Sequence, residues 1–231
     1  MEEDMDMLRK EDGRYPFVLD TPQIAQLNRR ASICDHPLAR LMTLATLVPC
    51  PATVLASIDV RDFDRRNQVL TIASPLRGHT RVALGMAAAA AVRDAIAGRT
   101  SGLLFGGDHD LPIEPDHDAV AYFEELVADD GEGPLPFAFD FRSVREGVFA
   151  GMADGGVPQQ VAEAQAGLRH LTDGHRPETF FRVQERAASD WWAAQLGVPV
   201  SATIEVIRAG LRQLRWRDDP DGSTHDEGRR A

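Results

Sequence analysis

The densest chemistry in the chain lies in GGDHDLPIEPDHD, residues 106–118, which places two histidines and five carboxylates in thirteen positions. Neutral imidazole and carboxylate groups both bind transition metals such as zinc, iron and manganese. The stretch therefore predicts a candidate site for a divalent transition metal, of the kind that a hydrolase or an oxygenase uses. Its candidate ligands are His109, Asp110, Asp116 and His117.

The same stretch also suits an acidic surface turn, and this is the interpretation that we favour. Pro112 and Pro115 stiffen it, and Asp116 stands where it can cap the helix that follows. Carboxylates near a helix N-terminus are favoured by the helix dipole. We therefore predict no cofactor, and the metal site stays the alternative.

A second candidate is SDWWAAQLGVPVSATIEVIRAGLRQLRWR, residues 189–217, which resembles a helix-turn-helix. Ala193 stands four residues before the turn glycine Gly197, and the aliphatic pair of the second helix comes one residue late, at Ile204 and Ile207. The second helix also carries an arginine stripe that could reach phosphates or base edges. The stripe consists of Arg208, Arg212 and Arg215. A plain helical hairpin with solvated arginines is the competing interpretation.

Basic side chains also surround an expected helix start in SPLRGHTRVALG, residues 74–85. Arg77, His79 and Arg81 could bind an anion there, because helix N-termini attract negative charge. We favour instead an ion-pairing role against the acidic segment.

Trp191 and Trp192 are adjacent. On a helix they point about 100° apart, so we expect one to be buried and the other partly exposed. Together with Phe180, which precedes them on the same expected helix, they form a candidate protein interface.

The negative charge of the chain belongs to one segment. Eleven carboxylates and no basic residue lie between Arg99 and Arg142, and the other 25 acids balance the 25 lysines and arginines, so this segment holds the whole net charge of −11. Such a segment repels nucleic acid and attracts a basic partner.

Composition narrows the class of protein further. Cys34 and Cys50 form no CxxC pair, so we predict free buried thiols. The most apolar stretch, residues 82–92, is too short to span a bilayer, and the acidic N-terminus is unlike a signal peptide. We therefore expect a cytoplasmic protein without a membrane segment.

Hydrophobic periodicity predicts an α+β fold that is predominantly α. Alternating apolar residues at 54–60 and 69–72 predict a small antiparallel hairpin, and short strands are expected at 101–107 and 131–141. Thr21 is expected to cap the first helix. Apolar residues spaced by three and four predict helices at 21–33, 36–48, 80–98, 117–130, 144–152, 157–171, 176–197 and 198–216.

These elements predict four parts of the chain. Residues 1–14 form a flexible acidic arm, residues 15–141 an α+β region with the acidic segment at 100–141, and residues 142–217 a bundle of about four helices. Residues 218–231 form a disordered tail.

The charge segregation favours a non-enzymatic interaction, assembly or regulatory protein that binds other protein chains, including copies of itself. A DNA-binding regulator that uses residues 189–217 is the first alternative, and a metal-dependent enzyme that uses His109 and His117 is the second.

Overall fold

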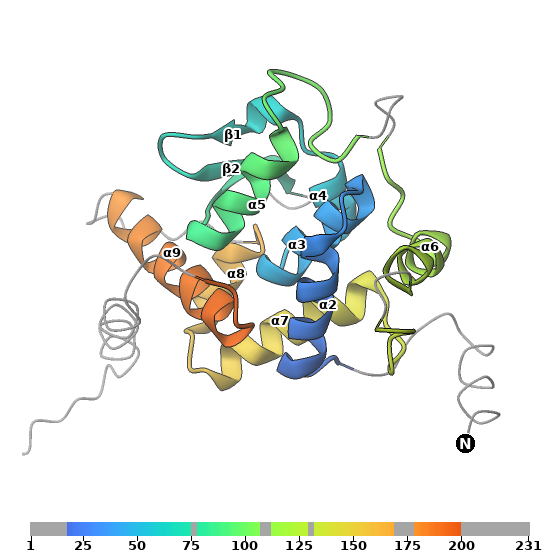
Figure 1. Ribbon diagram of the computed structural model, residues 1–231. Coiled ribbons are helices and arrows are strands. Elements are labelled where there is room, and N and C mark those ends of the chain that lie inside the picture. The colour runs from blue at the N-terminus through green and yellow to red at the C-terminus, as the bar shows by residue number, and fades with distance from the viewer. Residues whose placement is uncertain (1–17, 75–77, 107–111, 129–131, 169–177, 200–231) are drawn as a thin grey trace, which may run out of the picture.

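Helix α3 (Pro37–Leu47) lies at the centre of the molecule, and other helices surround it (Figure 1). It contacts α2, α4, α5, α6, α7 and α9. Eight of its eleven residues are buried, because its sequence PLARLMTLATL is apolar on nearly every face. The prediction that this helix begins near His36 is confirmed, because the His36 side chain caps it and Pro37 is its first residue.

The computed structural model describes residues 18–74, 78–106, 112–128, 132–168 and 178–199. Within them the chain is mostly helical with one small three-stranded antiparallel sheet, as predicted. One hydrophobic core runs through the helices and the inner face of the sheet. The expected N-terminal arm and C-terminal tail lie outside the described residues.

The first helix, α2 (Thr21–Ile33), packs against α3. Its cap is Asp20 rather than the expected Thr21. The Asp20 carboxylate accepts the backbone N–H of Gln23 at 2.8 Å, and the Gln23 side chain accepts the backbone N–H of Asp20 at 2.9 Å. This reciprocal capping box satisfies two N–H groups at the helix start.

The sheet lies one element later in the sequence than predicted. Residues 54–56, expected to begin the first strand at 54–60, belong to helix α4, because a short apolar run does not distinguish a strand from a buried helix. The second predicted strand is confirmed as β2, and its other partner, β3, occupies the beginning of the stretch predicted as a helix. The elements are α4 (Ala52–Ala56), the 3₁₀ turn η1 (Val60–Asp62), β1 (Phe63–Asp64), β2 (Val69–Ser74), β3 (Gly78–Ala83) and α5 (Met86–Ile96).

The remaining elements are helices. The strands expected at 101–107 and 131–141 are not found in the described parts of those ranges. In the first range, Leu103 forms only an isolated β-bridge with Asp59. The helix expected at 198–216 lies almost entirely outside the described residues. The helices are α6 (His117–Ala128), α7 (Phe141–Asp154), α8 (Gln159–Gln165) and α9 (Glu178–Gln195).

A glycine stripe on α7 lets neighbouring elements approach its backbone. A Cβ on Gly147 would lie 2.4 Å from the backbone oxygen of Leu19, and one on Gly151 would lie 2.4 Å from the ring of Trp192. A Cβ on Gly155, which follows the last residue of the helix, would likewise overlap the ring of Trp191. The four-residue spacing places the three glycines on one face, so α9 and the chain before α2 pack closely on α7.

We predict that Gly151→Ala destabilises the protein. Alanine is the better helix former by about 1 kcal/mol, but its methyl group would overlap the fully buried Trp192 ring, and overpacking of this kind costs about 1–3 kcal/mol. Chemical denaturation measures the change. Ala153→Gly, at an exposed position of the same helix, is the control. Its free energy of unfolding should fall only by the difference in helix propensity between alanine and glycine. A stabilised Gly151→Ala variant would contradict the close packing of α7 against Trp192.

Candidate nucleic-acid interface

The structure supports the capping role of the acidic turn. The Asp116 carboxylate accepts the backbone N–H of Ala119 at 3.0 Å and so caps α6, and His117 is the exposed first residue of that helix. His109 and Asp110 lie outside the described residues. Among the residues that are described, no group of three or more histidine, cysteine, aspartate or glutamate side chains is placed to hold a metal ion.

The two tryptophans divide as expected. Trp192 is fully buried and donates its indole N–H to the backbone oxygen of Thr46 at 2.8 Å, whereas Trp191 is half-buried beside Gly155. Trp192 therefore packs in the core of its own chain and has no surface to offer a partner. Phe180 lies in the first turn of α9, and its side chain is outside what the structure describes.

The arginine stripe of residues 208, 212 and 215 lies outside the described residues, but a different basic group is exposed on the hairpin. The turn between β1 and β2 is held by Asp64, whose carboxylate accepts the backbone N–H groups of Arg66 and Asn67, each at 3.0 Å, and the Asn67 side chain at 2.7 Å. These hydrogen bonds, led by that of the Asn67 side chain, lower the pKa of Asp64. The turn presents Arg65 and Arg66 to solvent.

Strand β3 adds two more exposed basic side chains to the hairpin. Leu70, Ile72 and Val82 are buried on the inner face of the sheet, whereas His79 and Arg81 are exposed on the outer face. Both basic residues therefore lie on a strand, and the expectation that they surround a helix start is wrong. Arg81 also lies close enough to Asp64 to help lower the pKa of that carboxyl.

Helix α9 holds the hairpin by bonding to its main chain. The backbone N–H of Ala83, the last residue of β3, donates to the Glu185 carboxylate at 3.0 Å. The backbone oxygen of the same residue accepts the Gln165 side chain of α8 at 2.7 Å. The Arg186 guanidinium donates to the backbone oxygen of Asn67 in the β1–β2 turn, which places Arg186 next to Arg65 and Arg66. Strand β3 and the turn are thereby tied to two helices from the other end of the chain.

A second carboxylate of α9 caps a different helix. Asp190 accepts the backbone N–H of Met86 at 2.5 Å, at the start of α5, where the N-cap residue Gly85 has no side chain to do so. A Cβ on Gly85 would lie 2.5 Å from the Asp190 carboxylate, so only glycine allows this approach. Burial raises the pKa of Asp190, against the opposing effects of the Met86 N–H and of Arg186.

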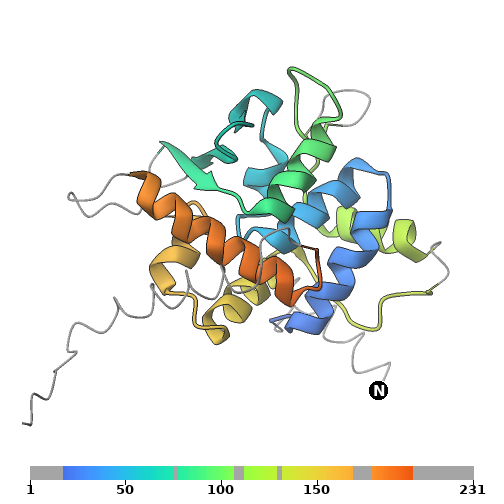
Figure 2. The same ribbon diagram turned by 60° about the vertical axis from the view of Figure 1, so that its left-hand side comes forward.

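The exposed arginines of the hairpin and the acids of α6 belong to elements on different sides of the molecule. The hairpin and α9 lie together on one side, and α6 lies on the opposite side in both views (Figures 1 and 2). Around α6 the described acids are mostly exposed, and no lysine or arginine lies between 112 and 132. Arg65, Arg66, His79, Arg81 and Arg186 form what we call the basic surface.

The cysteines bear out the thiol prediction in part. Cys50 is buried, its Sγ donates to the backbone oxygen of Gln165 at 3.3 Å, and burial raises its pKa to about 12. Cys34 is free but only partly buried, and its pKa is raised first by burial and then by Asp35.

Comparison with known proteins identifies the fold and no more. The sequence matches no protein-family model and no curated protein. Among solved structures, the chain is similar to the crystal structure of XerA recombinase, with a TM-score of 0.52 and 12% identity over 90% of this chain and 67% of that chain. It also matches the Tn1549 transposon integrase in complex with a circular intermediate DNA, with a TM-score of 0.43 and 14% identity over 77% of this chain and 58% of that chain. The first match shows that the fold of this chain resembles that of the XerA structure.

None of the described helices combines the length and the hydrophobicity that crossing a bilayer requires.

We predict that Asp190→Asn changes how stability depends on pH. A carboxyl with a raised pKa in the folded state contributes stability that is full below its ordinary value of 3.8 and is lost as pH rises through the folded value. Asparagine keeps an oxygen acceptor for Met86 but does not titrate. As pH rises through this range, the free energy of unfolding of the wild type should therefore fall relative to that of Asp190→Asn. A difference that stays constant with pH would show that the carboxyl titrates normally.

Proposed function

We propose that this protein binds duplex DNA through the basic surface and acts by contact, in a regulatory or architectural role. The observation that carries the proposal is the gathering of the exposed Arg65, Arg66 and Arg81 on the hairpin, with the half-buried Arg186 of α9 beside them, on the side opposite the acidic α6. Guanidinium groups gathered on one face are typical of proteins that bind a phosphate backbone. The acidic side repels the DNA phosphates and so favours binding through the opposite face.

The likeness of this fold to that of the XerA structure supports the same proposal by analogy. XerA, which this chain resembles in structure, is named as a recombinase, a class of protein that works on DNA. A fold hosts many functions, so the likeness adds to the charge distribution and does not replace it. The acidic side, left free when DNA lies on the basic surface, would contact other protein chains, as the sequence led us to expect.

We predict that Arg65→Ala/Arg66→Ala weakens duplex binding and flattens its salt dependence. Each lost phosphate contact lowers the magnitude of the slope of log K against log salt by about 0.9, so the slope of the double variant should be about 1.8 smaller. If the two proteins bind equally at 1 M salt, the variant should then bind about 60-fold more weakly at 0.1 M salt. Fluorescence anisotropy with a labelled duplex measures both quantities. Arg93→Ala, at an exposed arginine of α5 that is not part of the basic surface, is the control and should bind like the wild type.

Two results would overturn the proposal. Absence of duplex binding by the wild type at low salt would end it, and an unchanged slope in Arg65→Ala/Arg66→Ala would move the interface elsewhere. An Arg208→Ala/Arg212→Ala variant in the same titration distinguishes the helix-turn-helix alternative, because only that alternative needs these two residues.

A further inference from the structure

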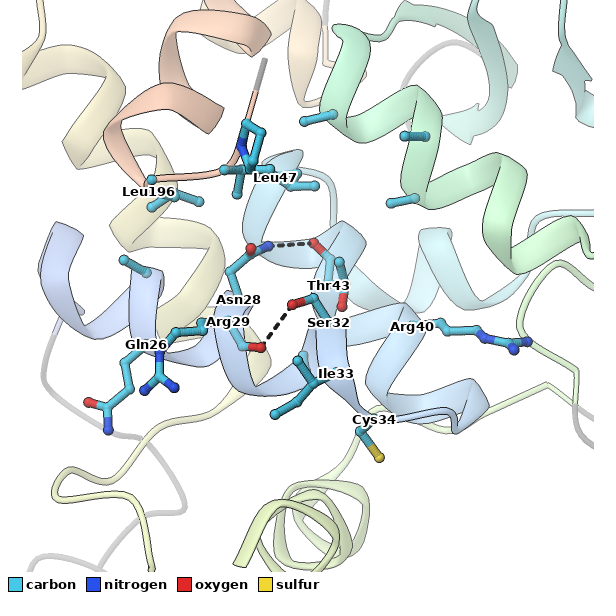
Figure 3. A pocket seen from close by; sticks show the side chains of 18 of the residues that line it. Gln26, Asn28, Arg29, Ser32, Ile33, Cys34, Arg40, Thr43, Leu47 and Leu196 are labelled. Carbon is cyan, nitrogen blue, oxygen red and sulfur yellow. Dashed lines mark hydrogen bonds between the residues drawn. The ribbon is translucent and has the colours of Figure 1, made fainter. Parts of the chain in front are cut away.

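An open groove of about 960 Å³ lies between α2, α3 and α5, and no residue of the basic surface lines it (Figure 3). Leu196 and Leu47 stand at one end of it, and Ile33 and Cys34 at the other. The segment that follows α9, residues 196–199, forms part of its wall. The groove therefore involves three helices of the first half of the chain and the last described residues.

The lining of the groove is suited to an apolar helix. Ala87, Ala90 and Ala91 line it from α5, and such small side chains allow a neighbouring helix axis to come close. Ile33 also lines it with 66% of its surface exposed, so an apolar occupant of the groove would remove that side chain from water.

One charge in the groove is unbalanced. The two arginines that line it are already paired, Arg29 with Glu132 and Arg40 with Asp35. The exposed Asp94 carboxylate has no hydrogen bond or ion pair with any of the described residues. An occupant with a positive edge beside an apolar face would complement this lining.

The chain itself supplies such a segment. It leaves the described region at Pro199, which lines the groove, and 32 residues follow, 200–231. In helical conformation the apolar residues of 204–214 share one stripe, and the arginines lie about 90° around the helix from it, along one edge. The apolar stripe is Ile204, Ile207, Leu211 and Leu214, and the arginine edge is Arg208, Arg212 and Arg215.

We propose that residues 204–214 dock as a helix in this groove of their own chain, with the apolar stripe on the alanines of α5 and the arginine edge toward Asp94. The five residues from Pro199 to Ile204 span up to about 17 Å, so the segment reaches the groove without unfolding α9. A tether this short gives a local concentration in the millimolar range, which favours the chain's own groove over that of a second copy.

Thiol labelling tests the docking in the full-length chain. A reporter is made by Ala91→Cys in a Cys34→Ser background, and Cys50 stays silent because it is buried with a pKa of about 12. We expect Ile207→Asp/Leu211→Asp to speed maleimide labelling of the reporter about fivefold, which corresponds to a segment docked four-fifths of the time. Ala209→Asp/Gln213→Asp, on the opposite side of the same helix, should leave the rate unchanged.

A second reporter and a change of protein concentration complete the test. Arg93→Cys on α5, exposed but not lining the groove, should label at one rate in every background. Equal rates for the Ala91→Cys reporter with and without Ile207→Asp/Leu211→Asp would overturn the docking. Protection that grows with protein concentration would also overturn it, because the segment would then occupy the groove of another copy.

Discussion

The structure depends on the polar contacts that α9 makes with the main chain of other elements. Glu185 bonds to the last residue of β3, Asp190 to the first residue of α5, and Trp192 to the backbone of α3. A side chain that bonds to backbone groups sets the position of a whole element, and these buried groups would be costly to leave unpaired. One helix thereby determines how the hairpin, α5 and the central helix lie relative to one another.

Two further constraints allow α9 to take this place. Gly151 and Gly155 leave room for the tryptophan rings, and Gly85 leaves room for Asp190. With α9 so placed, Arg186 reaches the β1–β2 turn and joins the hairpin arginines, while α6, attached through α3, carries its acids on the far side. The charge distribution behind the proposed function is thus a consequence of backbone packing.

Much of the helical fold could be predicted from the sequence, and little of the site. Helices α2, α3, α6 and α9 show regular apolar spacing, which local periodicity reveals. Strand β3 was missed because GHTRVA runs directly into the alanine-rich helix, and α4 was mistaken for a strand because its apolar run is short. Arg186 and Asn67 are 119 residues apart, so no local pattern could bring them together. The four-residue spacing of the glycines along α7, by contrast, is visible in the sequence and predicts that neighbouring elements approach this helix closely.

The most direct test of the central claim, that α9 holds a hairpin whose outer surface meets DNA, is hydrogen exchange of the full chain with and without a duplex. DNA should slow exchange in the β1–β2 turn, in β3 and in the part of α9 that faces them, and should leave α6 unchanged. Slowing confined to α6 or to residues 204–217, with the hairpin unaffected, would contradict the claim.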